Sequence, residues 1–277
     1  MTLKTYLQDA YRERFAVGAF NVYNLESAKT VAKAANEAKK PILIQTTESA
    51  LEYADFDQLV SIIDKIKTES KIPLYLHLDH GKQVDNVKKC IKSGYDSVMF
   101  DGSRLPLEQN IIVSRELRRL AHLKGVVFEA EIGRIGGEED NVESREFKTD
   151  PLEALKFYSE VKPDMLAVAI GNVHGERTAA EQLDFSLLAK ISGLLKCPLV
   201  LHGCSNRAAR EYQVAISQGV VKINIDTELR EAFVEGIKRA LHKREADPRK
   251  ILTYAMDEIS KSVQEKIEIF SCSKLSC

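Results

Sequence analysis

Short apolar runs alternate with longer amphipathic stretches along almost the entire chain. The apolar runs are only a few residues long and predict eight β-strands: Ala16–Phe20, Ile42–Gln45, Leu74–Leu78, Ser97–Phe100, Val126–Glu129, Met165–Ala169, Leu199–Leu201 and Val220–Ile223. Apolar residues recur at helical spacing in eight further stretches: Ser27–Lys39, Phe56–Thr68, Val84–Lys92, Leu107–His122, Pro151–Val161, Phe185–Leu195, Ala208–Gln218 and Thr227–Leu241. Strands that are apolar on both faces belong to parallel sheets covered by helices. Eight such units therefore predict an α/β fold, the closed (β/α)8 or TIM barrel.

The length of the chain suits one barrel with additions. TIM barrels typically use about 250 residues, and we expect residues 1–277 to form a single domain. Gly18–Asn21, at the end of the first strand, lacks the glycine spacing of a dinucleotide-binding fold, which disfavours an open doubly wound sheet. Arg249–Phe270 predicts an extra C-terminal helical segment that caps the barrel or pairs with another subunit. The long polar connection from Ile132 to Thr149 is typical of an active-site lid or a disordered loop.

Composition narrows the classes of partner. A formal net charge of −1 gives no reason to expect a nucleic acid or an anionic membrane. No apolar run approaches the length that spans a bilayer, and Met1–Ala10 lacks the apolar core of a signal peptide. The five cysteines show no paired spacing, which indicates reduced thiols. We therefore expect a cytoplasmic protein that binds neither nucleic acid nor membrane.

Three of the six histidines each follow a predicted strand and stand beside Gly or Asp: His80, His174 and His202. The carboxyl ends of barrel strands meet at one face, where these imidazoles can surround one metal ion. Three imidazoles with an open fourth position are the ligand set of a catalytic Zn²⁺ site, and Co²⁺, Mn²⁺ or Fe²⁺ are alternatives. His77 lies deeper in its strand, and we expect it to pack rather than to bind metal.

Other polar side chains occupy the remaining strand ends, and most are acid–base, metal-ligand or phosphate-binding types: Asn21, Thr47, Asp79, Asp101, Glu131, Asn224 and Asp226. Charged groups at this face of a barrel are typical of a catalytic site. The stretches His202–Asn206 and Asn224–Thr227 each lead into a predicted helix after strands seven and eight. Free backbone N–H groups at such helix starts predict a phosphate site.

Several motifs, in order along nearly the whole chain, carry a family resemblance: Val17–Val22, His77–Gly81, Ser97–Ser103, Glu129–Asp140 and Val221–Leu229. In these motifs the chain resembles the class II, metal-dependent ketose-bisphosphate aldolases, which comprise fructose-1,6-bisphosphate and tagatose-1,6-bisphosphate aldolases. The resemblance implies reversible cleavage of a phosphorylated ketose to dihydroxyacetone phosphate and an aldehyde such as glyceraldehyde 3-phosphate. Together with the extra C-terminal helix, it also suggests a homodimer or homotetramer.

The resemblance also implies roles for individual residues. His80, His174 and His202 would bind the catalytic Zn²⁺, and Asp101 and Glu131 a second or alternative cation, monovalent or divalent. Asp79 would transfer a proton at the aldehyde-derived oxygen, and Glu139 would exchange the proton on the ketose-phosphate carbon. The substrate-binding residues would be Asn21, Thr47, Gly175, Gly203, Ser205, Asn224, Asp226 and Thr227.

The chain departs from the family pattern near the predicted phosphate site. Cys204 and Asn206 stand where the family usually has glycine, and Glu176 and Arg177 follow His174-Gly175 in place of an aromatic residue and a lysine or small polar residue. Added side chains and the Glu176 charge predict weaker phosphate binding, whereas Arg177 can contact the phosphate. The preferred ketose is therefore expected to differ from fructose 1,6-bisphosphate.

Other functions remain open at this stage. One is a divergent relative that acts on a different ketose phosphate, and another is a relative that binds metal or sugar phosphate without catalysis. A barrel hydrolase that uses zinc-bound hydroxide is disfavoured, because it would not need the predicted phosphate-binding turns. A Schiff-base aldolase would use Lys222 as its nucleophile, but a lysine inside a strand is more typically ion-paired within the barrel.

Overall fold

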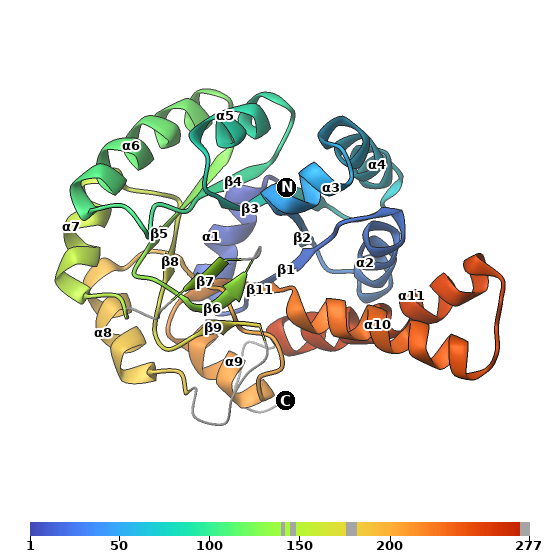
Figure 1. Ribbon diagram of the computed structural model, residues 1–277. Helices are drawn as coiled ribbons and strands as arrows, with labels where there is room; N and C mark the ends of the chain where they lie inside the picture. The colour runs from blue at the N-terminus through green and yellow to red at the C-terminus, as the bar shows by residue number, and fades with distance from the viewer. Residues whose placement is uncertain (140–141, 145–147, 176–181, 272–277) are drawn as a thin grey trace.

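The computed structural model describes residues 1–139, 142–144, 148–175 and 182–271. Within them, eight parallel strands close into a barrel in the order β1-β11-β10-β8-β5-β4-β3-β2 (Figure 1). The barrel strands are β1 (Val17–Asn21), β2 (Ile42–Thr46), β3 (Leu74–Gly81), β4 (Ser97–Phe100), β5 (Val127–Ile132), β8 (Met165–Val168), β10 (Leu199–Leu201) and β11 (Val220–Ile225). All eight predicted strands are present, and the predicted TIM barrel is confirmed.

Helices surround the barrel, and each barrel strand leads into at least one of them (Figure 1). They are α2 (Leu25–Ala38), α3 (Glu48–Tyr53), α4 (Phe56–Glu69), α5 (Val84–Lys92), α6 (Leu107–Leu123), α7 (Pro151–Val161), α8 (Phe185–Leu195), α9 (Ala209–Ser217) and α10 (Thr227–His242). Local chemistry fixes several of their starts: Asn24 and Ser27 form a capping box on α2, and Asp150 caps α7 ahead of Pro151. Among the residues described, no helix is both long enough and apolar enough to cross a bilayer.

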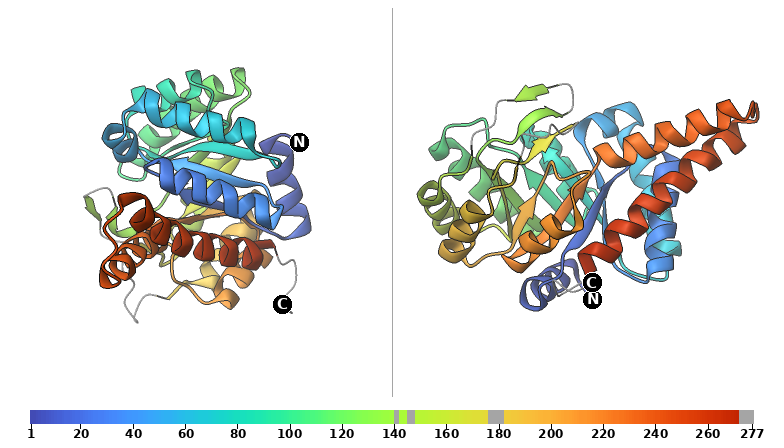
Figure 2. Two further views of the ribbon diagram at one scale, coloured as in Figure 1. Left: turned by 90° about the vertical axis from the view of Figure 1, so that its right-hand side faces the viewer. Right: turned by 90° about the horizontal axis from the view of Figure 1, so that it is seen from below.

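Helix α1 (Leu3–Glu13) closes the end of the barrel at which the strands begin (Figure 2). Its buried residues Leu3, Leu7 and Ala10 pack against side chains near the start of the barrel strands, among them Val17 and Leu43. These side chains fill the end of the barrel that α1 covers. The polar strand ends lie at the opposite end of the barrel.

The predicted C-terminal helix is confirmed as α11 (Pro248–Ser271), which forms a hairpin with α10 that projects beyond the barrel (Figures 1 and 2). One stripe of α11 is buried, at Ala255, Ile259, Val263 and Ile267, and its end returns to the barrel, where Ala16 N donates to Phe270 O at 2.9 Å. This helix therefore packs beside the barrel, and α1 is the helix that caps it.

Close packing within the hairpin gives a stability prediction. A Cβ atom added at Gly236 of α10 would lie 2.4 Å from Ala255 Cα of α11, so the two helices would have to separate. We expect Gly236→Ala to destabilise the protein by about 1–3 kcal/mol in urea unfolding. Gly193→Ala on α8 is the matched control, because a Cβ there meets nothing within 4 Å and the helix propensity favours alanine. Equal stability of the two variants would contradict the packing argument.

Candidate metal and substrate site

Polar side chains gather where the barrel strands end. A small cavity there is lined by residues that follow or end β1, β3, β10 and β11: Asn21, Asp79, Gly203, Ser205, Asn224, Asp226, Thr227 and Arg230. All but Arg230 were predicted from the sequence as site residues. The barrel therefore brings together side chains that are as far apart in the chain as Asn21 and Thr227.

The end of β3 is irregular, and this irregularity shapes the site. In a regular strand, consecutive side chains point to opposite faces. The pairing of β3 with β4 shifts register between Leu78 and Gly81, and His80 takes a left-handed φ of 45°. As a result Asp79 and His80 both reach the barrel mouth, since Asp79 contacts Asn224 and His80 contacts His202. A non-glycine residue at positive φ is often found at a functional site.

His80 and His202 face each other across the barrel mouth, with His80 Nε2 2.8 Å from His202 Nδ1. The opposite nitrogen of each ring is paired with a carboxylate. His80 Nδ1 lies 3.1 Å from Asp101 Oδ2, and His202 Nε2 lies 2.8 Å from Glu129 Oε1. If each N–H points to its carboxylate, the two facing nitrogens both carry lone pairs, which repel unless a positive charge lies at them. The donor set therefore fits a metal ion, in the carboxylate–histidine–metal arrangement.

The electrostatics of these groups also suit metal binding. Burial, reinforced by the neighbouring His80 and Lys222, holds the pKa of His202 well below its usual range. The His202 ring is thus neutral near pH 7, and the neutral ring is the form that binds metal. Burial alone would raise the pKa of the Asp79 carboxyl, but His80, His202, Lys222 and a hydrogen bond from Asn21 together lower it.

Two overlapping groups in the described part of the chain have the spacing of a metal site: Asp79 with His80 and His202, and His80 with Asp101 and Glu131. They share His80, as expected if Asp101 and Glu131 serve an alternative cation position. The side chain of His174 lies outside the described residues. Its backbone belongs to β9 (Val173–His174), and nearby Asn172 Nδ2 donates to the carbonyl of His202 at 3.0 Å. The end of β8 is thereby tied to the end of β10.

Three side-chain amides hold Asp79. Asp79 Oδ2 accepts from Asn21 Nδ2 at 3.0 Å and from Gln45 Nε2 at 3.3 Å. Its other oxygen, Oδ1, accepts from Asn224 Nδ2 at 2.8 Å. Asp79 is buried with 1% exposure, so these bonds fix the direction of both carboxylate oxygens. Such fixed geometry is what a group that transfers protons to a bound substrate requires.

Besides the metal-ligand candidates, two described residues that were predicted to bind substrate are not among those that line the cavity, Thr47 and Gly175. Thr47 caps α3, where its hydroxyl accepts from Ala50 N at 3.2 Å. Gly175 directly follows β9 with a left-handed φ of 87°. Glu139 ends strand β6 (Gly136–Glu139), but its side chain lies outside the described residues, as does the whole of Arg177.

The long connection predicted as a lid contains two further strands. β6 pairs with β7 (Val142–Ser144) in an antiparallel hairpin and with β9 in parallel, so that Gly137 lies opposite His174. The base of the connection is closed by Thr149, whose hydroxyl donates to Ile132 O at 2.7 Å and accepts from Ala169 N at 2.9 Å. The backbone of this connection is thus held beside the strand that carries His174.

The turn after β10 directs its unusual side chains away from the cavity. Cys204 is buried in the hydrophobic core, and its carbonyl accepts a hydrogen bond from the Tyr212 hydroxyl. Asn206 takes the left-handed φ of 56° and donates from Nδ2 to Glu231 Oε2 at 2.8 Å. Asparagine tolerates this conformation better than most residues. The turn therefore forms without glycine at either position.

Three residues of this region were not predicted as site residues from the sequence. Gln45 and Glu129 are fully buried. Gln45 forms a hydrogen bond with Asp79, and Glu129 forms one with His202. Arg230 lines the cavity from the first turn of α10, with Nη2 2.9 Å from Asp226 Oδ2. For Gln45 and Glu129 the available signal was a polar residue in an otherwise apolar strand, since such a group must find a buried partner.

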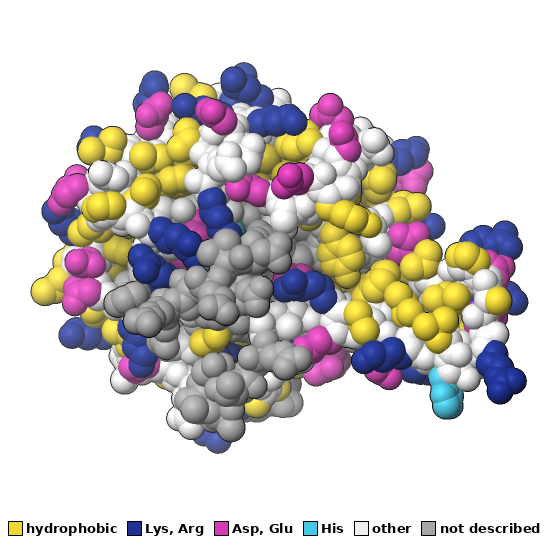
Figure 3. Space-filling view, in the orientation of Figure 1, with side chains coloured by type: hydrophobic (Ala, Val, Ile, Leu, Met, Phe, Trp, Pro, Cys, Tyr) yellow, Lys and Arg dark blue, Asp and Glu magenta, His cyan; other side chains and the backbone are white. Residues whose placement is uncertain are grey.

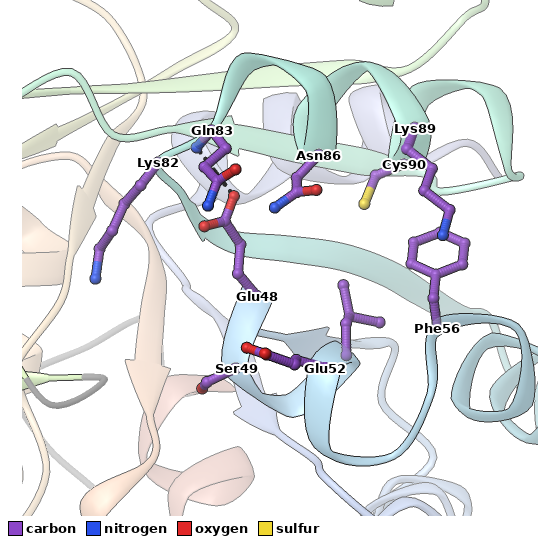
Figure 4. Close-up of a pocket in the computed structure, with 10 residues that line it drawn as sticks. Glu48, Ser49, Glu52, Phe56, Lys82, Gln83, Asn86, Lys89 and Cys90 are labelled. Carbon is purple, nitrogen blue, oxygen red and sulfur yellow. Dashed lines mark hydrogen bonds between the residues drawn. The ribbon is translucent and has the colours of Figure 1, made fainter.

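A larger pocket, about 510 Å³, lies between α3 and α5 beside the ends of β2 and β3 (Figure 4). It carries both signs of charge, with Glu48 and Glu52 on one wall and Lys82 and Lys89 on the other. Lys89 Nζ lies 3.6 Å from the centre of the Phe56 ring, and Gln83 N donates to Glu48 Oε1 at 3.0 Å. Among the residues that the structure describes, no predicted site residue lines this pocket. Its mixed charge does not match the predicted phosphate site.

Comparisons with known proteins show which family and fold the chain shares. The chain is similar to the YdjI aldolase of Escherichia coli K12, with 28% identity, a TM-score of 0.85, and coverage of 98% of this chain and 96% of that one. It is also similar to a putative fructose-1,6-bisphosphate aldolase of Coccidioides immitis, with 28% identity, a TM-score of 0.89, and 97% and 95% coverage. The fructose-bisphosphate aldolase of Campylobacter jejuni shares the fold, at 23% identity and a TM-score of 0.83 over 98% and 94% of the two chains. Residues 1–274 match the family described as fructose-bisphosphate aldolase class-II, and the chain therefore belongs to that family.

Proposed function

We propose that this protein is a zinc-dependent aldolase that reversibly cleaves a phosphorylated ketose, of the fructose or tagatose 1,6-bisphosphate type, to dihydroxyacetone phosphate and an aldehyde. One observation carries the proposal. His80 Nε2 and His202 Nδ1 face each other at 2.8 Å, each ring is backed by a carboxylate, and the cavity that Asp79 lines lies beside them. Membership of the class II aldolase family supports the reaction class.

In this proposal His80, His174 and His202 hold the zinc, and Asp101 and Glu131 serve a second or alternative cation. When bound, Zn²⁺ supplies a Lewis acid that polarises the ketose carbonyl and stabilises negative charge on the adjacent oxygen. Asp101 and Glu129 orient the two described histidines through their outer nitrogens. A catalytic site of this kind leaves room for substrate oxygens beside the protein ligands.

The protein's carboxylates supply the proton transfers. In the cleavage direction, Asp79 takes the proton from the hydroxyl at carbon 4 of the ketose. The bond between carbons 3 and 4 then breaks, the aldehyde leaves, and the electron pair stays on carbon 3. Glu139 returns a proton to carbon 3, which completes dihydroxyacetone phosphate. The amides of Asn21, Gln45 and Asn224 hold the Asp79 oxygens in place for the first step.

The phosphate would be held where β10 and β11 lead into their helices. Gly203, Ser205, Asn224, Asp226 and Thr227 line the cavity there, and the start of a helix such as α10 favours an anion through its backbone N–H groups and its dipole. Gly175 and Arg177, which follow β9 in the sequence, would contribute, as would Asn21 and Thr47 from the ends of β1 and β2. Lys222 is a poor candidate for a Schiff-base nucleophile, because its ammonium is fully buried and paired with Glu129 Oε2 at 2.9 Å.

The test of the proposed function is a substrate panel. Fructose 1,6-bisphosphate, tagatose 1,6-bisphosphate and the corresponding 1-phosphates are supplied, and released dihydroxyacetone phosphate is measured. The proposal expects release from at least one of them, and the ratio of kcat/KM values identifies the preferred ketose. No release from any member, by protein that contains zinc, would favour a non-catalytic relative.

The replaced turn residues give a further prediction. Because the side chains of Cys204 and Asn206 do not line the cavity, we expect the Cys204→Gly/Asn206→Gly variant to keep the wild-type KM for its ketose. Its stability should fall by about 1–2 kcal/mol, since a buried side chain is lost. Urea unfolding and steady-state kinetics measure the two effects. A tenfold decrease in KM would show instead that these side chains obstruct the phosphate.

The assembly and location are also part of the proposal. We expect a homodimer or homotetramer in the cytoplasm. The α10–α11 hairpin projects from the barrel and shows apolar side chains on its surface (Figure 3), and Val234 and Leu241 of α10 are 49% and 56% exposed. A second copy of the chain could cover them. Light scattering that finds only the 31.1 kDa monomer would contradict this part of the proposal.

A further inference from the structure

An ion pair lies inside the barrel beneath the candidate metal site. Lys222 of β11 places Nζ 2.9 Å from Oε2 and 3.2 Å from Oε1 of Glu129 in β5. Both side chains have 0% exposure. Two charges so deeply buried lose their hydration, and an apolar pair of similar volume is often at least as stable. The proposed proton transfers use neither residue.

The carboxylate of this pair also contacts a metal-ligand candidate. Glu129 Oε1 lies 2.8 Å from His202 Nε2, so the carboxylate stands between the ammonium and the imidazole. An ionised carboxylate only accepts hydrogen bonds, and His202 Nε2 therefore carries the proton. On the other side of the ring, Asn224 Nδ2 lies 3.0 Å from His202 Nδ1 while it donates to Asp79 Oδ1 at 2.8 Å. An amide donor at Nδ1 requires that nitrogen to hold the lone pair.

We propose that Glu129 and Lys222 are positioning residues that fix the orientation and tautomer of His202, so that Nδ1 faces the metal. Glu129 acts on the ring directly, and Lys222 acts through Glu129 by holding both carboxylate oxygens. The inference rests on the proposed metal-binding function. A purely structural alternative is that the pair only joins β5 to β11 across the barrel interior.

The two explanations differ when the pair is replaced by apolar side chains. The Glu129→Met/Lys222→Met double variant leaves no unpaired charge, so the metal-free protein should stay folded with a thermal midpoint close to that of the wild type. Its zinc affinity, measured by competition with a chelator, should nevertheless fall by about 10–100-fold, the usual effect of losing a carboxylate behind a metal-bound histidine. Single Glu129→Gln should weaken zinc binding in the same direction.

His77→Gln is the matched control. His77 is equally buried, its Nε2 lies 3.7 Å from Glu129 Oε2, and its Nδ1 bonds to Ser97 Oγ at 2.9 Å. It belongs to the same cluster but makes no described hydrogen bond to His202. We expect this variant to keep wild-type zinc affinity. An equal loss in His77→Gln would show that any disturbance of the cluster weakens the site, and would overturn the inference.

A second measurement needs no variant of the pair. Nitrogen-15 NMR of the metal-free wild type, with the His202 signals identified by their absence in His202→Gln, should show the proton on Nε2. A proton on Nδ1 would contradict the proposal directly. If the wild type binds zinc and the double variant binds it equally tightly, only this inference fails. If the wild type itself binds no zinc, the proposed function fails and the positioning role falls with it.

Discussion

Replacing His202 with alanine is expected to remove both bound zinc and activity. His202 Nδ1 is one of the two described nitrogens that face each other at the barrel mouth, and the ring is fully buried, so water cannot simply replace it. Loss of a catalytic metal removes several kcal/mol of charge stabilisation in the transition state, and about 4 kcal/mol corresponds to roughly a thousandfold lower rate. Zinc content by atomic emission and release of dihydroxyacetone phosphate measure the two effects.

His122→Ala is the control for this variant. His122 lies on α6 and pairs with Asp164 at 2.7 Å, away from the strand ends that carry the site. It should keep its zinc and its kcat, with at most a loss of stability. If His202→Ala retained one zinc per chain and near-normal activity, the ligand set proposed at this site would be wrong.

Asp79→Ala is expected to lower kcat for cleavage by about 10²–10⁴-fold, the usual contribution of a positioned acid or base. The Asp79 carboxylate is oriented by Asn21, Gln45 and Asn224, and its lowered pKa keeps it ionised as a base. The variant should still exchange the α-proton of dihydroxyacetone phosphate with solvent, because that step is assigned to Glu139. Deuterium uptake measured by NMR separates exchange from cleavage.

Glu139→Ala completes the comparison with the opposite pattern. It should suppress solvent exchange at carbon 3 and slow overall turnover, while zinc content stays at the wild-type level. The backbone of Glu139 lies in β6, beside the strand that carries His174. If Asp79→Ala and Glu139→Ala lost proton exchange to the same extent, the division of roles between the two carboxylates would be mistaken.

The strands and the face of the site follow from the sequence because a parallel barrel imposes a simple pattern. Every residue of strands such as β1, β2 and β10 is buried, which matches the apolar runs from which they were predicted. Polar residues at strand ends then meet at one face by geometry alone, as Asn21 and Asp226 do at the cavity. Helix α1 was not predicted, although Leu3, Leu7 and Ala10 repeat at helical spacing. It precedes the first strand and therefore lies outside the repeating strand–helix pattern from which the other helices were predicted.

The contacts within the site could not be predicted in the same way. Asp79 and His80 both reach the barrel mouth only because β3 is irregular there and His80 adopts a positive φ, and neither feature has a sequence signal. Thr47 also follows a strand end, and the strand pattern does not reveal that its hydroxyl caps α3 by accepting from Ala50 N. The Glu129–Lys222 pair was partly predictable, since two opposite charges inside apolar strands must meet. Its contact with His202 depends on the register of β5 and β10, which the sequence does not reveal.

The central claim is that catalysis depends on a metal held by the barrel-mouth histidines. The most direct measurement is release of dihydroxyacetone phosphate from the preferred ketose before and after removal of metal with a chelator. We predict close to one tightly held divalent ion per chain, loss of activity when it is removed, and recovery when Zn²⁺ is returned. Full activity in the metal-free protein would contradict the account and would return attention to Lys222.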